Sequence, residues 1–209
     1  MSGACLSTVP LYRSYKPILD AILFAIHDCG FIARTALEDT GAGQTRIEKL
    51  RTIIEGSLFS IHDLSRVKLN KADPLARLNM RFECGLALGA KFFGGQKQRR
   101  KDLLVLEEEP YLSRQAMSDI AGQDAHAHEN DPLKAIEHVR SFLARKAPSS
   151  DIPGHNYIKK RFKRFRAALP KMAQQKRLTV KELESFDYLP DLHRLMIEWQ
   201  RKNNAAREI

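Results

Sequence analysis

Residues 61–66 read IHDLSR, and residues 77–89 read RLNMRFECGLALG. The first run is typical of a strand that ends in polar residues, and the second of a helix with one glutamate in its first turn and glycines after it. Together they bring an aspartate, a serine, arginines and a glutamate to one edge of a sheet, where α/β proteins bind small ligands. The pattern predicts a nucleotide-handling site and does not by itself indicate catalysis.

Strand and helix patterns alternate on both sides of this stretch. The expected strands are residues 6–11, 31–37, 58–62, 103–106 and 123–128. The expected helices are residues 15–29, 47–56, 79–93 and 131–145, with a short helix at 113–120. This alternation predicts an α/β fold with a doubly wound, five-stranded parallel sheet.

Glycines mark several of these helices. Gly30 and Gly56 are expected to end the helices before them. Gly85 and Gly89 lie inside the helix at 79–93, where each costs roughly 1 kcal/mol. We therefore expect close packing of a neighbouring backbone to compensate for them.

The sequence divides into three parts. Residues 1–146 form the α/β domain, and residues 147–154, rich in proline, serine and glycine, read as a linker. Residues 155–209 form a basic helical extension with helices expected at 155–175 and 180–204. Thr179 and Glu182 have the spacing of a capping box at the start of the second helix.

The charge of the chain is uneven. The net charge is +10 over 209 residues, and residues 151–209 hold 14 Lys or Arg against 7 Asp or Glu. Residues 159–166 (KKRFKRFR) are the most basic run. Such a run fits an acidic partner such as nucleic acid, a phosphorylated ligand or a membrane surface, but a solvated helix face is the interpretation we favour.

Bulk composition favours a cytoplasmic protein. No apolar run approaches the ~20 residues that span a bilayer, and the first residues lack the pattern of a secretory signal. Cys5, Cys29 and Cys84 are scattered and odd in number, so they predict neither a disulfide framework nor a metal pair. We expect no membrane association, no metal and no cofactor.

Three short motifs carry little weight. His62 in a strand is more often a hydrogen-bonded core histidine than a metal ligand. His126 and His128 share one face of a strand, yet no third ligand is evident. Residues 41–43 (GAG) lack the Lys-Ser/Thr pair of a P-loop.

The order of the motifs resembles a known group. Residues 34–38 (RTALE), 46–49 (RIEK), 61–66, 79–85 (NMRFECG) and 119–124 (DIAGQD) carry the similarity. Over about residues 5–145, the chain resembles an uncharacterised bacterial protein family close to TIR-like and nucleoside 2-deoxyribosyltransferase-like domains. The resemblance implies a flavodoxin-like sheet of order 2-1-3-4-5 and a tendency to form homo-oligomers.

The same resemblance implies a reaction. Enzymes of this kind cleave N-glycosidic bonds of nucleosides or NAD with a glutamate on the helix after the third strand, and Glu83 matches that position. The chain departs from the pattern at residues 7–12 (STVPLY), where a more acidic end is expected, and at Arg81, where proline fits better.

Glu83 and Asp63 are the candidate catalytic residues. A carboxylate such as Glu83 can stabilise an oxocarbenium-like state, although a glutamate at a helix start is also stabilised by the helix dipole. Asp63 can bind ribose hydroxyls or cap the turn before Ser65. The candidate ligand-binding residues are Ser65, Arg66, Arg34, Asn79 and Arg81, with Arg77 as a further phosphate ligand.

Three functions fit these features. The first is a nucleotide hydrolase acting on NAD or a related nucleotide, with Glu83 and Asp63 facing one pocket and Glu83 partly exposed. The second is a non-catalytic module that senses a nucleotide in an occluded cleft and signals through the C-terminal helices. The third is nucleic-acid binding through residues 159–166, which we do not favour because Phe162 and Phe165 fit a helix face docked on the core.

Overall fold

The computed structural model describes residues 3–10, 12–37, 43–65, 79–111, 124–147 and 151–204. The helix expected at 113–120 and the side chains of Arg66 and Arg77 lie outside these ranges.

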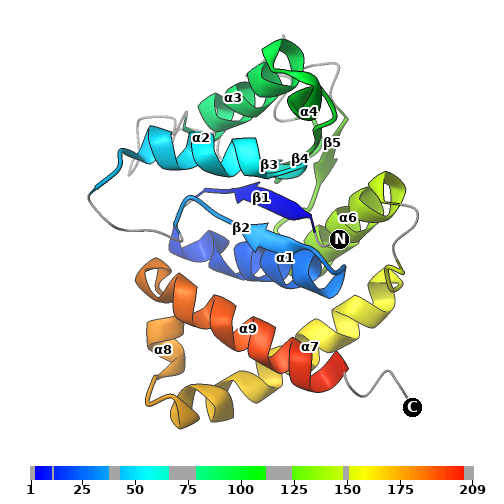
Figure 1. The fold of residues 1–209 in the computed structure, drawn as a ribbon. Helices are drawn as coiled ribbons and strands as arrows, with labels where there is room; N and C mark the ends of the chain where they lie inside the picture. The colour runs from blue at the N-terminus through cyan, green and yellow to red at the C-terminus, as the bar shows by residue number, and fades with distance from the viewer. Residues whose placement is uncertain are drawn as a thin grey trace.

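Five parallel strands form one sheet. They are β1 (Ala4–Thr8), β2 (Ile32–Arg34), β3 (Phe59–Asp63), β4 (Asp102–Glu107) and β5 (Ala125–Ala127). The strand order is β2-β1-β3-β4-β5, so the predicted doubly wound sheet and its 2-1-3-4-5 order are confirmed (Figure 1). The order reverses between β1 and β3, the kind of position at which open α/β sheets bind ligands.

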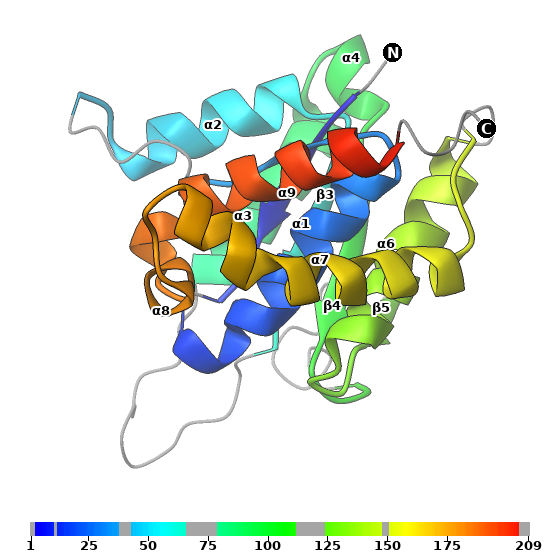
Figure 2. The same cartoon turned by 90° about the horizontal axis from the view of Figure 1, so that it is seen from below.

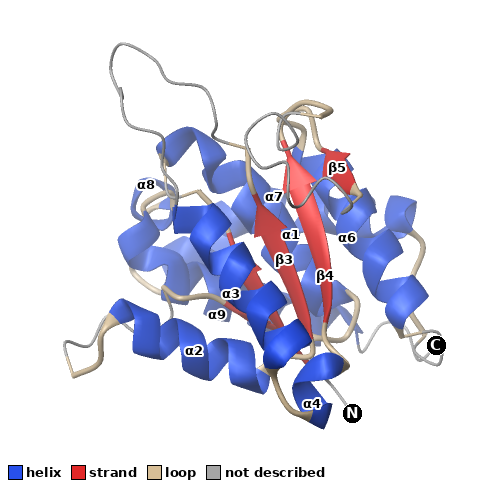
Figure 3. Cartoon of the chain, turned by 90° about the horizontal axis from the view of Figure 1, so that it is seen from above, coloured by secondary structure: helices blue, strands red, loops and turns tan. Residues whose placement is uncertain are grey.

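Helices cover both faces of the sheet. The short turn η1 (Arg13–Tyr15) leads into α1 (Lys16–Asp28), which packs with α6 (Pro132–Lys146) on one face. On the other face lie α2 (Arg46–Gly56) and α3 (Asn79–Phe93), followed by α4 (Gln96–Arg99) (Figures 1 and 3). The carboxyl ends of β1 and β3 therefore meet the first turns of α2 and α3.

Local sequence signals explain where several helices begin and end. Gly30, with φ of 86°, ends the turn after α1 as predicted. Thr45 and Glu48 form a reciprocal capping box at the start of α2. The Asp131 side chain caps α6, and Pro132 occupies the first turn, where its missing N–H costs nothing.

The C-terminal helices differ from our prediction in one respect. Helix α7 (His155–Gln175) matches the predicted 155–175, but the single helix expected at 180–204 is wrong. It is divided into α8 (Val180–Leu183), the turn η3 (Phe186–Tyr188) and α9 (Leu189–Asn204) (Figure 2). The Ser185 side chain accepts a hydrogen bond from the Asp187 N–H and so starts a new turn.

The C-terminal helices form a third layer against α1. Phe24 of α1, Phe162 and Phe165 of α7, and Trp199 of α9 are buried and share one apolar cluster, with ring centroids 5.4–5.9 Å from Phe24. The predicted docking of Phe162 and Phe165 on the core is therefore confirmed. Helix α1 is covered by the sheet on one side and by this layer on the other (Figure 1).

Much of the basic run 159–166 is paired inside the protein. Arg161 is 2 % exposed, and its Nε donates to both oxygens of Asp28 at 3.0 and 2.9 Å. Lys159 pairs with Glu137 at 2.8 Å and Arg166 with Asp20 at 3.4 Å. These contacts give the run a structural role, and nucleic-acid binding stays a prediction.

The packing around the glycines of α3 differs from our prediction. A Cβ atom built on Gly85 or Gly89 meets no atom of the described residues within 4 Å, so no described backbone segment packs closely against either residue. Within the described ranges, the expectation of close packing is wrong.

No helix in the described ranges is long and apolar enough to cross a bilayer.

Candidate functional site

A small pocket lies at the carboxyl end of β1, beside the reversal in strand order. It encloses about 270 Å³ including open solvent, and nine residues from β1, α1, α2, α3 and the segments after β1 and β2 surround it: Ser7, Thr8, Val9, Leu19, Thr35, Ala36, Leu37, Arg46 and Glu83. Only about 10 Å³ of this space is free for a ligand, room for about one water molecule, whereas small-molecule sites commonly enclose about 300–1,000 Å³. The pocket is narrow, and Ser7, Thr8, Thr35, Arg46 and Glu83 give it a polar side.

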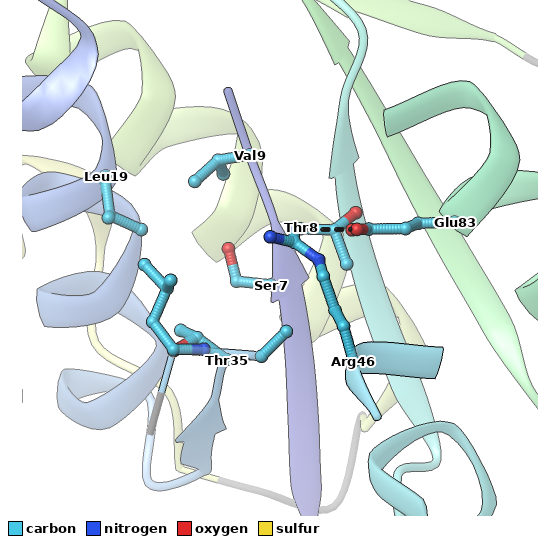
Figure 4. Close-up of a pocket in the computed structure, with 9 residues that line it drawn as sticks. Ser7, Thr8, Val9, Leu19, Thr35, Arg46 and Glu83 are labelled. Carbon is cyan, nitrogen blue, oxygen red and sulfur yellow. Dashed lines mark hydrogen bonds and ion pairs between the residues drawn. The ribbon is translucent and has the colours of Figure 1, made fainter. Parts of the chain in front are cut away.

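An ion pair closes one side of the pocket. Arg46 Nη2 donates to Glu83 Oε1 at 3.0 Å, and the Arg46 side chain is 50 % exposed while that of Glu83 is 4 % exposed. Figure 4 shows the Arg46 guanidinium and the Glu83 carboxylate joined by a hydrogen bond beside β1. Burial raises the pKa of Glu83, and the hydrogen bond and charge of Arg46 act in the opposite direction. The hydrolase hypothesis expected Glu83 to be partly exposed. In the structure its side chain is instead buried and paired with Arg46.

Two hydroxyl groups from β1 lie beside this ion pair. Thr8 Oγ1 is 2.7 Å from His62 Nδ1, and His62 Nε2 is 3.0 Å from Ser60 Oγ, so Thr8 and the buried His62 satisfy each other. Ser7 is 2 % exposed, and its Oγ has no hydrogen-bond partner within the described part of the chain. An unpartnered buried hydroxyl on a pocket wall is the group a ligand can satisfy.

The other predicted ligand residues are dispersed. Arg34 ends β2, one residue before Thr35 on the pocket wall, and Asn79 is exposed at the start of α3. Arg81 is 9 % exposed, and its Nε and Nη2 have no hydrogen-bond partner in the described ranges. Burial lowers the pKa of Arg81. At about 100° per residue, Arg81 lies on the other side of α3 from Glu83.

Asp63 belongs to a separate buried cluster. Its Oδ2 accepts from the Tyr15 hydroxyl at 2.5 Å and lies 2.9 Å from His128 Nε2, and its Oδ1 accepts from the Ser65 N–H at 2.9 Å and from the Ser65 hydroxyl. The turn-capping interpretation of Asp63 is confirmed. Asp63 is 0 % exposed, so within the described structure it does not share a pocket with Glu83.

Ser65, His128 and Asp63 are not arranged as a nucleophilic triad. The backbone N–H of Asn130 donates to His128 Nδ1 at 3.1 Å, so the ring proton resides on Nε2. That same Nε2 faces both Asp63 and the Ser65 hydroxyl, at 2.9 and 3.0 Å. A protonated Nε2 cannot accept a proton from Ser65, and Nδ1 already accepts the hydrogen bond from Asn130. His128 therefore cannot act as the general base of a triad. The cluster is structural.

Asp63→Asn is expected to lower the free energy of unfolding by about 2 kcal/mol. Both carboxylate oxygens accept hydrogen bonds in the wild type, so the N–H₂ group of asparagine would face donors where an acceptor is needed. Burial, followed by the Asp63 charge, raises the pKa of Tyr15 well above its ordinary value, so the phenol remains a donor. Urea denaturation measures the loss. The matched control is the exposed Asp124→Asn, and equal effects of the two substitutions would contradict the prediction.

The histidines do not gather into a metal site. No group of three or more His, Cys, Asp or Glu side chains in the described ranges is placed to hold an ion. His126 instead lies against His138, with ring centroids 5.1 Å apart and ring planes tilted by 31°. Cys84 is buried in the packing of α3 against β3 and β4.

A comparison of the chain with protein-family models, with curated proteins and with solved structures finds no match to any of them. The resemblance to TIR-like and deoxyribosyltransferase-like domains therefore stays a prediction from the sequence. Beyond the fold class, the pocket is the feature of the molecule that bears on function.

Proposed function

We propose that the protein binds a nucleotide at the end of β1, where displacement of Arg46 opens the pocket, and acts as a nucleotide-sensing module. The observation that supports this most strongly is the Arg46–Glu83 pair beside the unpartnered Ser7 hydroxyl, next to the reversal in strand order. These groups supply a cation for phosphate, a carboxylate for ribose hydroxyls and a free hydroxyl.

Arg46 and Glu83 differ in their exposure to solvent. Arg46 is half exposed at the first turn of α2, whereas Glu83 is buried in α3. A ligand phosphate offers the guanidinium two oxygens and competes with the single hydrogen bond to Glu83. Ligand binding would then release Glu83 toward the sugar and move Arg46, which couples occupancy of the pocket to α2.

Glu83 also favours a second candidate function, hydrolysis of an N-glycosidic bond of NAD or another nucleotide. The C–N bond would break with its electrons passing to the leaving base, Glu83 would stabilise the positive charge on the ribose, and water would add to the anomeric carbon. The proton of water would go to solvent when neutral nicotinamide leaves NAD, and to the base when a nucleoside base leaves as an anion. Glu83 can act in this way only after Arg46 has left it, because the ion pair neutralises the carboxylate.

Arg46→Met is expected to weaken nucleotide binding at least about 10-fold, since a charged hydrogen bond contributes roughly 1.5–3 kcal/mol. Isothermal titration with NAD, NADP, ADP-ribose, AMP and deoxynucleosides measures the affinity. Arg51→Met is the matched control, because Arg51 is on the same helix with a 72 % exposed side chain. Failure of every compound to bind would contradict the proposal.

Chromatography of the same mixtures separates sensing from hydrolysis. Release of free base or nicotinamide by the wild type, lost in Glu83→Gln, would establish hydrolysis. Binding without any product would establish the sensing module. Glu83→Gln should retain the fold, because the half-exposed Arg46 remains hydrated when its partner becomes neutral.

A further inference from the structure

Helix α3 is apolar on two opposite faces. Met80, Cys84 and Ala87 are buried against the sheet and α2. On the outer side, Phe82 is 58 % exposed and Phe93 is 90 % exposed. A contiguous apolar surface of this kind on a helix is normally covered by another element or by a partner. No described segment of the chain covers the outer face of α3, which is in the outer layer of the molecule (Figures 1 and 3).

The exposed residues form one stripe. At 3.6 residues per turn, Phe82, Gly85, Gly89 and Phe93 lie along the same side of α3, and Phe92, 59 % exposed, borders them. No atom of the described part of the chain lies within 4 Å of a Cβ built on Gly85 or Gly89. The stripe therefore has a bare centre between aromatic ends, which permits a second helix to approach closely.

A groove runs beside the stripe, between α2 and α3. Its apolar lining includes Ile47, Ile54, Leu86 and Ala90, and it encloses about 900 Å³ including open solvent. Polar residues from α2 and α4 form its rim: Glu48, Arg51, Glu55 and Gln98. An apolar floor with a charged rim is the usual composition of a protein interface.

We propose that a second copy of this chain docks on this surface, with the two α3 helices antiparallel across a two-fold axis near Gly89. Phe93 and Gly85 are each four residues from Gly89, so the axis places Phe93 of one copy opposite Gly85 of the other. Each aromatic ring then meets the bare centre of the opposing stripe and the edge of its groove. The contact is isologous, as in most homodimers.

The exposed area suits such a dimer. Taking about 200 Å² for a whole phenylalanine, the rings of Phe82, Phe92 and Phe93 expose about 400 Å². A stable interface covers about 800 Å² on each partner. The rings supply about half of this, and the α2/α3 groove, with Ile47 44 % exposed, adds apolar surface beside them.

Shape, rather than charge, selects the antiparallel orientation. Exposed Lys97, Arg99 and Arg100 follow the end of α3, and the first two turns of α2 carry exposed Arg46 and Arg51 beside Glu48, so the charges do not distinguish the orientations. Parallel helices would oppose Phe93 to Phe93, whereas antiparallel helices oppose each ring to Gly85. The stripe is therefore complementary to itself, and this self-complementarity, together with the exposed area, favours a second copy as the occupant.

Sedimentation equilibrium of the full chain tests the proposal. The wild type is expected to reach twice the 23.8 kDa monomer mass at micromolar concentration. Phe93→Glu and Gly89→Leu are each expected to weaken association at least roughly 30-fold, as loss of a central interface residue does. Ile32→Glu is the control, because Ile32 is 47 % exposed on the edge strand β2, where a charge is tolerated.

Gly89→Leu separates association from folding. Open space surrounds Gly89 in one copy, and leucine has a higher helix propensity than glycine, so the midpoint of thermal unfolding of the monomer should not fall. A dimer lost in this variant with an unchanged midpoint supports the α3 interface. A wild type that is monomeric at all concentrations, or a dimer unaffected by Phe93→Glu and Gly89→Leu, would overturn it and leave the surface to a different protein.

Discussion

Replacement of Arg161 by methionine is expected to lower the free energy of unfolding by about 3–5 kcal/mol. The guanidinium is 2 % exposed and Asp28 is 4 % exposed, so the substitution leaves a carboxylate buried without its cation. The same guanidinium donates to the Asn203 carbonyl at 3.2 Å and to Asn204 Oδ1 at 2.8 Å. One side chain therefore joins α1, α7 and α9.

Urea denaturation followed by tryptophan fluorescence measures this loss. Trp199 is the single tryptophan of the chain, and Arg161 Cζ lies 5.1 Å from the centre of its ring. Arg164→Met is the matched control, because Arg164 is an exposed arginine on the same helix, and it should change stability by no more than about 0.5 kcal/mol.

A double variant separates the buried charge from lost packing. Arg161→Met combined with Asp28→Leu removes both charges and should recover much of the loss, since apolar replacements of a buried pair are often neutral. A loss for Arg161→Met no greater than that of the Arg164 control would contradict the prediction.

The second large effect is a loss of stability in mild acid. Burial lowers the pKa of His62 from 6.5 to about 3. Burial and the facing His193 lower the pKa of His27 from 6.5 to about 3. Both histidines are neutral in the folded protein, and the unfolded chain binds more protons below pH 6.5. Their contribution is full above pH 6.5 and decreases as the pH falls toward 3.

The size of this effect follows from the interval between the two pKa values. At pH 5 each histidine should contribute a loss of about 2 kcal/mol relative to pH 7.5. Two such losses are a large part of the 5–15 kcal/mol that stabilises a typical domain. Urea denaturation at pH 7.5, 6 and 5 measures the slope, and equal stability at all three values would contradict the prediction.

Carboxyl groups with shifted pKa values also make stability depend on pH, so the histidine effect needs a control. Burial raises the pKa of Asp20 and of Glu83, so their contribution is lost as the pH rises and opposes the histidine effect. The pKa values of Asp102 and Glu137 are lowered by lysine partners, and these groups contribute mainly below pH 5. His27→Gln removes one histidine alone, so its difference in slope from the wild type isolates that residue.

Periodic patterns predicted the fold well because they arise from local sequence. Helix α3 matches its predicted range of 79–93, and the unbroken apolar run at 103–106 lies inside β4. The division of residues 180–204 was missed although its signals are local. Ser185 starts a turn, and Pro190 fits only the first turn of a new helix.

The pocket was harder to predict because its parts come from distant segments. Glu83 was identified from the resemblance, but Ser7 and Arg46 were not singled out. The spacing of Thr45 and Glu48 marks the start of α2 and could have placed Arg46 at the ligand edge of the sheet. Nothing local connects Asp63 with His128, since they meet only through the pairing of β3, β4 and β5.

The burial of α1 between the sheet and the C-terminal helices has a consequence for synthesis on the ribosome. Asp28 and Arg161 are separated by 133 positions, so Asp28 emerges long before its cation exists. At about 5–20 residues per second, the delay is on the order of 10 to 30 seconds. During that time the nascent chain carries an uncovered apolar face around Phe24, a surface that chaperones bind. Completion of α9 ends this exposure.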